Sequence, residues 1–447
     1  MNEDFPTVPF KTHGGAEVPH RKNTAQAESV VLPPPEQVVL PMQQHVGPPL
    51  TPTVKVGDHV LIGQKIADSD AFVSAPIHAS ISGNVSAFKK VSLAGGQVQN
   101  AVVIDSDGKM EISPEVQPPK IDSKDDFLKA VHASGLVGLG GAGFPTYVKL
   151  TVPKGKNVDT LIINVAECEP YITSDNRCAL EDTEKAFTGI RAVQKWLDIH
   201  RVIIGVESNK PDVIEKLNQV LAESKETRDG EIHLLKLRSR YPQGAEKILI
   251  QSCTGRRVPM GGLPADVGCI VMNITSAARL GDYLTTGMPL TTKRVTIDGS
   301  AIQEPKNVIV PIGTNIRTII DFCGGYKEPP KKILMGGPMM GISIASDELP
   351  VVKQNNGIIC LGEQEAHKME PTACIRCGRC VSGCPMNLMP TLLEKYAAAK
   401  RVDMLKKLSV MDCMECGTCA FNCPAGRPLV QAIRLGKAMV KAEGKKK

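Results

Sequence analysis

Two copies of one cysteine pattern, close to the carboxyl end, constrain this chain more than any other feature. Each copy reads C-x2-C-x2-C-x3-C-P, once from Cys374 to Pro385 and again from Cys413 to Pro424. The two-residue gaps let three thiolates converge, and this run of cysteines is the one that ligates [4Fe–4S] clusters. We therefore predict two [4Fe–4S] clusters in an α-helical, ferredoxin-type domain over residues 362–447.

The fourth cysteine of each copy is expected to serve the cluster of the other copy, as in two-cluster ferredoxins. This crossover predicts two ligand sets, which are Cys374, Cys377, Cys380 and Cys423 for one cluster and Cys384, Cys413, Cys416 and Cys419 for the other. The competing interpretation is a pair of zinc sites. Zinc needs only four ligands in C-x2–4-C pairs and has no use for the further cysteines and the proline, so the pattern favours clusters.

Length and composition indicate a multidomain protein that does not span a membrane. The 447 residues suggest roughly three or four domains, and 42% of them are hydrophobic, which is enough for several cores. No stretch approaches the ~18 consecutive apolar residues of a membrane helix, and no secretory signal is visible. With 4% aromatic residues and a formal net charge of only +6, the composition argues against nucleic-acid binding. Six cysteines lie outside the motifs and are interpreted as buried thiols: Cys168, Cys178, Cys253, Cys269, Cys323 and Cys360.

The N-terminal part is predicted to form an arm followed by a small β module. Residues 1–50 are rich in proline and polar residues and are typical of an extended arm, with a disordered leader as the alternative. In residues 51–115, apolar and polar residues alternate between glycine turns, which predicts a small sandwich or barrel. This stretch resembles the barrel-sandwich hybrid of lipoyl and biotinyl carriers. The turn that would hold their carrier lysine contains Ile77 and His78 instead, so we expect a structural module with His78 at the surface.

Alternating strand and helix patterns dominate the middle of the chain. Over residues 120–290, helical segments such as TEKAFTGIRAVQKWL follow buried strands such as DTLIINVA. This alternation predicts a Rossmann-like α/β domain with a largely parallel sheet, in which ligands sit at the carboxyl ends of the strands. Residues 291–345 return to strands and turns and resemble a β-grasp module of the SLBB type. The predicted fold class is therefore multidomain α/β.

A glycine-rich loop is the first candidate binding element of the α/β domain. Five glycines fall within residues 135–143, and Phe144 and Lys149 follow them. Glycines let the backbone approach a phosphate or a flat ring, and successive N–H groups can hold an anion. No strand immediately precedes the loop, and its spacing differs from the usual dinucleotide fingerprint. The loop alone is therefore weak support for a nucleotide site.

Three further motifs follow predicted strands and read NVAECEP, YPQGAE and VMNIT. They contribute six candidate residues, which are Asn164, Glu167, Glu169, Gly244, Glu246 and Asn273. Junctions of this kind line one edge of an α/β sheet, so we expect these residues and the glycine-rich loop to form a pocket. The alternative interpretations are solvated carboxylates for Glu167 and Glu169, a surface position for Lys149 and a core position for Phe144.

The glycine-rich loop, written GLGGAGFPTYVK, and the three motifs together resemble the FMN- and NADH-binding subunit of respiratory complex I. Over nearly the whole chain, the order of modules resembles more closely the C subunits of Rnf-type ion-translocating electron transport complexes. The resemblance implies noncovalently bound FMN, and NADH or NAD as substrate. It assigns flavin contacts to Gly138, Gly140, Gly141, Lys149, Asn164, Glu167, Gly244 and Asn273. It assigns nicotinamide nucleotide contacts to Phe144, Glu169 and Glu246. Complex I subunits usually have other residues where Leu139, Ala166 and Met272 stand, which favours the Rnf family.

The Rnf resemblance implies an NADH-oxidising or NAD-reducing subunit that is peripheral to the membrane, on the cytoplasmic face of the cell inner membrane. Its partners would be the membrane subunits, the ferredoxin-type B subunit and the flavin-bearing subunits of the same complex. Two alternatives remain. One is a flavin and iron–sulfur reductase of the cobalamin-reductase type, in which the barrel-sandwich segment tends to follow the flavin domain. The other is an electron-wiring subunit that has lost its flavin.

Charged neighbours distinguish the two cysteine motifs. Arg376 and Arg379 flank the first, whereas Asp412 and Glu415 flank the second. Nearby charge tunes a cluster's reduction potential, and positive charge raises it, so we expect the higher potential at the first motif. The basic segment 425–447 is predicted to be an amphipathic helix that contacts anionic lipid or a partner, or is simply solvated.

Overall fold

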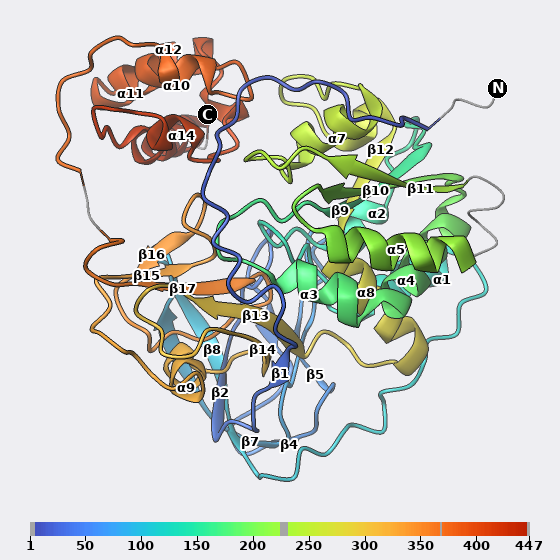
Figure 1. Cartoon of the computed structure of the whole chain (residues 1–447). Coiled ribbons are helices and arrows are strands. Elements are labelled where there is room, and N and C mark those ends of the chain that lie inside the picture. The colour runs from blue at the N-terminus through green and yellow to red at the C-terminus, as the bar shows by residue number, and fades with distance from the viewer. Residues whose placement is uncertain (1–4, 224–230, 367–368, 445–447) are drawn as a thin grey trace.

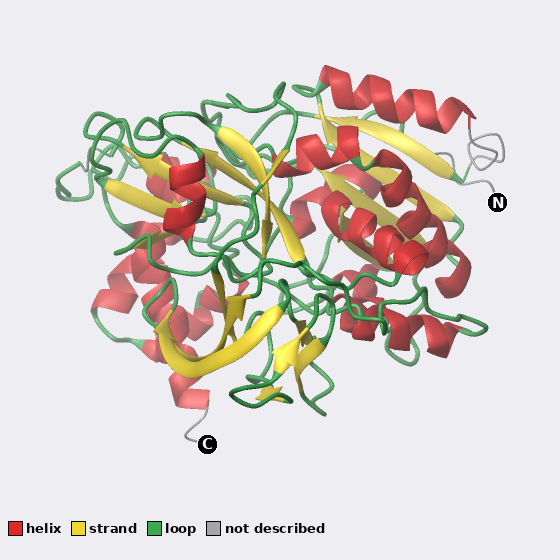
Figure 2. Ribbon diagram, turned by 90° about the horizontal axis from the view of Figure 1, so that it is seen from below, coloured by secondary structure: helices red, strands yellow, loops and turns green. Residues whose placement is uncertain are grey.

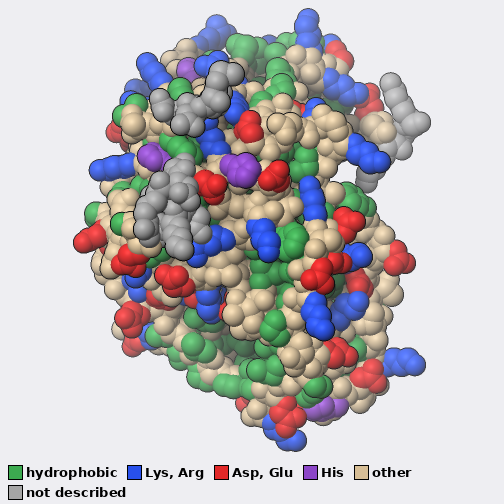
Figure 3. Space-filling view, turned by 90° about the vertical axis from the view of Figure 1, so that its right-hand side faces the viewer, with side chains coloured by type: hydrophobic (Ala, Val, Ile, Leu, Met, Phe, Trp, Pro, Cys, Tyr) green, Lys and Arg blue, Asp and Glu red, His purple; other side chains and the backbone are tan. Residues whose placement is uncertain are grey.

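The computed structural model describes residues 5–223, 231–366 and 369–444 (Figure 1). The first four residues of the predicted arm and the last three of the predicted basic tail lie outside the described residues. Within the described ranges, no helix combines the length and the apolar character needed to cross a membrane. On the face shown in Figure 3, basic and acidic side chains are interspersed without a continuous basic patch.

Two small antiparallel sheets form the barrel-sandwich hybrid. The strand orders are β2-β8-β7-β4 and β3-β5-β6. The bounds are β2 (Gln37–Pro41), β3 (Thr51–Pro52), β4 (His59–Val60), β5 (Lys65–Asp68), β6 (Ile77–His78), β7 (Gly83–Ser92) and β8 (Val98–Ser106). Strand β2 belongs to this module although it falls within residues 1–50, for which the sequence predicted only an extended arm.

His78 is buried, so our prediction of a surface position was wrong. The residue is 7% exposed, and burial lowers its pKa to about 3. The turn before it is covered by other parts of the chain: buried Lys353 donates from Nζ to the carbonyl of Pro76 at 2.5 Å and to that of Gly135 at 2.7 Å. The turn that would be exposed in a carrier domain is therefore fixed against the glycine-rich loop here.

A parallel four-stranded sheet with the order β11-β10-β9-β12 forms the core of the α/β domain, with helices on both faces (Figure 2). Alternate residues of β9 point to opposite faces: Leu161 and Ile163 pack in one hydrophobic core and Ile162 in another. The strands are β9 (Thr160–Val165), β10 (Arg201–Glu207), β11 (Ile232–Leu237) and β12 (Cys269–Asn273). The helices are α1 (Lys124–Ala133), α2 (Thr146–Leu150), α3 (Ser174–Glu181), α4 (Thr183–Leu197), α5 (Pro211–Glu223), α7 (Glu246–Thr254), η1 (Pro264–Val267) and α8 (Ile274–Thr286).

The β-grasp module is built on a six-stranded sheet with the order β1-β14-β13-β17-β15-β16. Its elements are β1 (Val30–Val31), β13 (Thr292–Asp298), β14 (Lys306–Pro311), α9 (Ile316–Phe322), β15 (Lys332–Met335), β16 (Ile342–Ile344) and β17 (Gly357–Leu361). The arm contributes the edge strand β1, which runs parallel to β14. Strand β17 lies beyond residue 345, where the sequence predicted the module to end, because it pairs with both β13 and β15.

The C-terminal domain is helical, as predicted, and is seen at the upper left of Figure 1. Its helices are α10 (Arg379–Ser382), α11 (Pro390–Ala398), α12 (Val402–Lys407), η2 (Val410–Asp412), α13 (Thr418–Phe421) and α14 (Leu429–Gly444). Leu429, Val430 and Ile433 of α14 are buried in the core of this domain. The helix of the basic segment is therefore half buried rather than free.

The arm crosses the α/β domain and reaches the C-terminal domain before it enters the β-grasp sheet (Figure 1). Phe10 donates its N–H to the carbonyl of Ser252 in α7 at 2.9 Å. Further along, Ala16 exchanges backbone hydrogen bonds with Tyr241. Lys22 then donates from Nζ to three carbonyls of the loop after β9. Domains that are distant in the sequence are thus joined by one extended segment.

Candidate functional site

The glycine-rich loop lies at the carboxyl end of β12. A Cβ on Gly140 would stand 2.6 Å from Nδ2 of Asn273, so this close approach requires glycine. The neighbouring carbonyl of Leu139 accepts a hydrogen bond from buried Lys293 at 3.1 Å. At the exposed tip, by contrast, no atom lies within 4 Å of a Cβ built on Gly141. The base of the loop is therefore fixed by protein contacts, and its tip is open to a ligand.

Asn273 caps α8 and is itself oriented by an acidic residue. Its Oδ1 accepts hydrogen bonds from the N–H groups of Thr275 at 2.9 Å and Ser276 at 3.3 Å. Its Nδ2 donates to Asp175 at 2.7 Å, and the Thr275 hydroxyl donates to the same carboxylate at 2.6 Å. The amide of Asn273 is therefore engaged within the protein, and it supports the loop above it.

Lys149 and Glu246 are brought together as an ion pair. Lys149 Nζ lies 2.7 Å from Glu246 Oε2 and donates to the carbonyl of Val271 at 3.0 Å. Both side chains are partly exposed, and such pairs contribute little to stability, so the ammonium can be shared with an anionic ligand. Phe144 is 36% exposed, and its carbonyl closes the loop by accepting the N–H of Gly138 at 2.8 Å.

Asn164, near the end of β9, is bonded to Gly244 in the loop that follows β11. Asn164 donates from Nδ2 to the carbonyl of Gly244 at 2.8 Å. A Cβ on Gly244 would touch Ala166 at 3.4 Å and Cys168 at 3.6 Å. The two loops therefore lie directly on one another at the carboxyl edge of the sheet.

Glu167 serves the start of α3. Its carboxylate accepts the N–H groups of Asp175 at 2.6 Å and Asn176 at 3.1 Å, in a residue whose φ is +45°. Burial raises the pKa of Glu167 to about 7, against the opposing attraction of the Lys22 ammonium. The carboxylate is thus occupied by helix N–H groups and is not a solvated loop carboxylate.

Glu169 joins the loop after β9 to the β-grasp module. Its carboxylate accepts the N–H groups of Met339 at 3.0 Å and Met340 at 2.8 Å, and the Tyr241 hydroxyl lies 3.4 Å away. Burial raises the pKa of Glu169. Its neighbours therefore differ from those of Phe144 and Glu246, with which the family resemblance grouped it.

Three residues at this edge were not found from the sequence. Asp175 orients Asn273, Lys22 fixes the loop after β9, and Tyr241 lies between the α/β and C-terminal domains. Tyr241 is the first residue of the motif YPQGAE, so its place in a candidate motif was a signal that could have identified it. Nothing local distinguishes Lys22 or Asp175 from ordinary polar residues of an arm and of a helix start.

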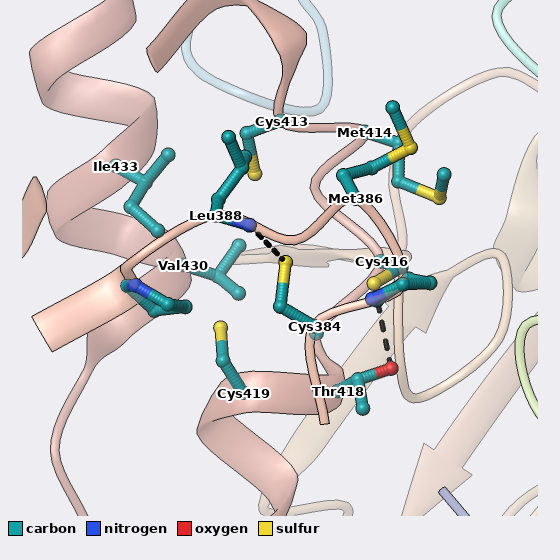
Figure 4. Close-up of a pocket in the computed structure, with 13 residues that line it drawn as sticks. Cys384, Met386, Leu388, Cys413, Met414, Cys416, Thr418, Cys419, Val430 and Ile433 are labelled. Atoms are coloured by element: carbon teal, nitrogen blue, oxygen red, sulfur yellow. Dashed lines mark hydrogen bonds between the residues drawn. The ribbon is translucent and has the colours of Figure 1, made fainter. Parts of the chain in front are cut away.

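The eight motif cysteines line two pockets in the crossed arrangement that the sequence predicted. The outer pocket, as we name it, is lined by Cys374, Cys377, Cys380 and Cys423. The inner pocket is lined by Cys384, Cys413, Cys416 and Cys419, which surround one space in Figure 4. Among the described residues, no group of three or more His, Cys, Asp or Glu side chains is placed to hold a single metal ion. Each pocket has four cysteines in its lining, the number of thiolates that a [4Fe–4S] cluster takes.

The two pockets differ in burial. Cys374 and Cys377 of the outer pocket are exposed, whereas Cys384 is 8% exposed. Backbone N–H groups point at inner sulfurs: Leu388 donates to Cys384 Sγ and Glu415 to Cys413 Sγ, each at 3.4 Å. Hydrogen bonds to the sulfurs are among the features that tune a cluster.

Family models match four consecutive parts of the chain. Residues 10–109 match the RnfC barrel sandwich hybrid domain, and residues 131–282 match the Nuo51 FMN-binding domain. Residues 294–343 match the SLBB domain, and residues 373–427 match the 4Fe-4S dicluster domain. The predicted order of modules and the predicted cofactors, FMN and [4Fe–4S] clusters, are confirmed at the level of these domains.

Relatives match over almost the whole length. The chain is 42% identical over 438 residues, 97% of its own length and 98% of the relative's, to the C subunit of the Na(+)-translocating ferredoxin:NAD(+) oxidoreductase complex of Acetobacterium woodii. It is 43% identical, over 95% of this chain and 93% of the relative, to the proton-translocating counterpart of Clostridium ljungdahlii. A solved NAD+-reducing [NiFe]-hydrogenase, air-oxidised, shares the fold over 74% of this chain and 67% of that one, with a TM-score of 0.50 and 17% identity. The chain belongs to the family of C subunits of Rnf-type ion-translocating oxidoreductase complexes.

Proposed function

We propose that this chain is the NADH-oxidising, or NAD-reducing, peripheral subunit of a membrane-bound, ion-translocating NAD:ferredoxin oxidoreductase. The observation that carries the proposal is the proximity of two kinds of site in one chain. An open glycine-rich loop stands at the carboxyl edge of a parallel sheet, and a four-cysteine pocket lies against the loops of that same sheet. The relatives named as C subunits of ferredoxin:NAD(+) oxidoreductases support this assignment.

The flavin site is proposed from the residues at the sheet edge. Gly138, Gly140 and Gly141 bring the backbone to the flavin, and Lys149 turns from Glu246 toward its phosphate. Asn164, Glu167, Gly244 and Asn273 fix the loops that shape the pocket. FMN, when bound, supplies the exchange between the hydride of NADH and single electrons, which iron–sulfur clusters carry onward.

The nicotinamide nucleotide is proposed to bind beside Phe144 and Glu246. Phe144 offers a partly exposed ring at the end of the open loop, and Glu246 has an exposed carboxylate next to Lys149. Glu169, the third residue grouped with them, has its carboxylate taken up by two backbone N–H groups. We therefore propose that Glu169 positions the loop around Met339 and Met340 and does not contact the nucleotide. The orientation of NADH, rather than proton transfer by a side chain, is what these residues provide.

Docking on the cytoplasmic face of a membrane complex is proposed from the family assignment. The partners proposed are the membrane subunits, the ferredoxin-type B subunit and the flavin-bearing subunits of the complex. These subunits would carry electrons between NAD and ferredoxin and couple that transfer to ion transport.

Anaerobic purification with quantification of iron, sulfide and flavin tests the proposal. We expect two clusters and one FMN per chain, with bleaching of the visible absorbance on addition of NADH. Intact clusters without FMN would identify an electron-wiring subunit instead, and zinc in place of iron would contradict the whole proposal.

A matched pair of variants separates the flavin site from the clusters. Lys149→Gln should lose FMN and keep its iron, because it removes the cation at the open loop and leaves the cysteine pockets untouched. Lys154→Gln, at an exposed position a few residues further on, should keep both cofactors. Equal flavin content in the two variants would show that Lys149 does not hold FMN.

A further inference from the structure

Two lysines of the β-grasp module contact the glycine-rich loop from inside the protein. Lys293 lies in β13 and Lys353 in the segment before β17, and each residue is 1% exposed. Lys293 donates from Nζ to the carbonyl of Leu139 at 3.1 Å, and Lys353 donates to that of Gly135 at 2.7 Å. Lysine is almost never fully buried unless it is paired, so the surroundings of these two ammonium groups are unusual.

The two buried ammonium groups are bonded to carbonyls and not to carboxylates. Among the described residues, neither Lys293 nor Lys353 forms an ion pair, although Asp175 and Asp68 attract them at longer range. Burial lowers the pKa of Lys293 to about 8 and that of Lys353 to about 7. Because carbonyls compensate a desolvated charge only in part, an anion bound close by would stabilise both ammonium groups.

The carbonyl groups of the glycine-rich loop are held by the protein, whereas its N–H groups are open. The hydroxyl of Ser276 and the N–H of Val46 act together with the two lysines as donors. The carbonyls that they hold are those of Gly135, Val137, Leu139 and Gly143. By contrast, the N–H groups of residues 140–143 have no hydrogen-bond partner in the part of the chain that the structure describes. Four consecutive open donors are suited to hold an anion.

Lys293 also sets the direction of one open donor. The peptide bond between Leu139 and Gly140 is trans and planar, so its C=O and its N–H point in opposite directions. Because the carbonyl points inward to Lys293, the N–H of Gly140 points away from it, and Gly140 is exposed. A cation on the carbonyl also polarises this amide and makes its N–H a stronger donor.

Building on the proposed function, we propose that Lys293 and Lys353 are positioning residues for the phosphate group of the flavin nucleotide. They hold the carbonyls of the glycine-rich loop inward, so that its open N–H groups face the phosphate. Their positive charge stabilises the phosphate anion through the loop, without direct contact. The β-grasp module therefore takes part in binding the flavin, although its lysines lie beneath the loop and do not touch the ligand.

A comparison of FMN with riboflavin, which lacks the phosphate, tests the proposal. The full-length protein with its clusters, freed of flavin under anaerobic conditions, is dialysed to equilibrium against each flavin to give both dissociation constants. In Lys293→Gln and Lys353→Gln, the preference for FMN over riboflavin should fall roughly tenfold, the size of one charge–charge interaction in a partly desolvated site. Glutamine can still donate to a carbonyl, so these changes remove chiefly the charge.

A third lysine of the same module serves as the matched control. Lys306 of β14 pairs with Glu304 at 2.6 Å and donates to the carbonyl of Phe322 at 3.5 Å, away from the glycine-rich loop. Lys306→Gln should therefore keep the full preference for FMN. Iron content and circular dichroism show whether each variant retains its clusters and its fold.

The ratio of the two affinities separates the effect of charge from that of packing. A variant whose loop is merely loosened would bind FMN and riboflavin less tightly by the same factor. That result, or an unchanged ratio, would overturn the proposal. Equal affinity of the wild-type protein for the two flavins would overturn it as well.

Rapid-quench hydrogen–deuterium exchange of the wild-type protein gives a second test, which decides even if the lysine variants do not fold. FMN should slow the exchange of the amides of residues 140–143 several-fold more than riboflavin does, because the phosphate occupies these donors. Equal protection by the two flavins would contradict the proposed place of the phosphate.

Failure of the proposed function can be distinguished from failure of the lysine roles. If the wild-type protein prefers FMN but its clusters do not bleach with NADH, the proposed function fails, and the lysine variants still decide the positioning roles. If NADH bleaches the clusters and all variants keep the same preference for FMN, only the positioning roles fail.

Discussion

The inner and outer pockets have the same sequence pattern and different surroundings. Each takes three cysteines from one motif and one from the other, and each motif contains a glycine in the left-handed region, with φ of +76° at Gly378 and +81° at Gly417. The α/β domain, the β-grasp loop around Met339 and the arm pack against Cys416 of the inner pocket, whereas Cys374 and Cys377 of the outer pocket are exposed. Two copies of one motif therefore have different surroundings, which arise from the segments that pack against them.

Loss of a ligand should give the largest contrast between the pockets. Cys384→Ser and Cys374→Ser should each lower the iron content by about half, because each disrupts one of two clusters. Metal binding is coupled to folding, and the inner pocket also holds the contacts between domains. The inner variant should therefore show the larger decrease in thermal unfolding temperature under anaerobic conditions. Equal decreases would mean that the contacts around the inner pocket do not depend on its cluster.

The clusters of the two pockets should also differ in their resistance to oxidation. Cys374 and Cys377 are exposed, so ferricyanide or a water-soluble iron chelator should destroy the outer cluster several-fold faster than the inner one. EPR of the reduced protein, recorded during exposure, measures the two losses separately. Loss of both signals at one rate would argue that solvent reaches the inner pocket equally well.

The two motif glycines offer a matched pair for stability. Alanine at either position costs roughly 1 kcal/mol, because an L-residue is disfavoured at positive φ. Gly378 has no atom within 4 Å of its Cβ position, but at Gly417 the carbonyl of Met339 would lie at 2.6 Å. We expect Gly417→Ala to cost a further ~1–3 kcal/mol through overpacking. Urea unfolding of both anaerobic holoproteins measures the difference, and equal midpoints would show that the β-grasp loop moves aside freely.

The smallest expected effect concerns the cluster potentials. Against the effect of burial, Lys437 and Arg434 hold the pKa of Glu415 below its usual range, with contacts of 2.5 and 2.8 Å. Their positive charge offsets the acidic residue that the sequence suggested would lower the potential of this cluster. The difference in reduction potential between the two clusters should therefore be smaller than the charged residues of the motifs imply.

Two substitutions test how nearby charges set the reduction potentials of the two clusters. Glu415→Gln leaves both cations without their carboxylate and should raise the inner potential by tens of millivolts, whereas Arg376→Gln removes an exposed cation and should lower the outer potential by less. Redox titration monitored by EPR measures both shifts. A fall of the inner potential in Glu415→Gln would show that the offsetting cations do not act on that cluster.

Several features were predictable because they depend on local pattern. The cysteine spacing predicted the two ligand sets, and the structure brings those cysteines together. Strand–helix alternation predicted the parallel sheet, since hydrophobic periodicity is read from neighbouring residues. The same periodicity could not show that β2 leaves the arm for the barrel-sandwich sheet or that β17 extends the β-grasp sheet, because strand pairing is decided between distant segments.

The candidate site also has features that local pattern predicted and features that it did not. The sequence predicted that the glycine-rich loop and the three motifs share one edge of the sheet. In the structure the loop approaches Asn273, and Lys149 pairs with Glu246. It placed His78 at the surface, although Lys353 and Gly135 cover that turn.

The sequence by itself determined which cysteines carry the cluster-binding pattern and where glycines leave the backbone open. Only the tertiary structure decided which pocket lies against the flavin domain. The deciding contacts, among them Tyr241 to Cys416 and Gly15 to Gly383, join residues that are more than a hundred positions apart. Such contacts leave no periodicity or spacing in the chain, because burial and electrostatic environment arise from all the segments that surround a site.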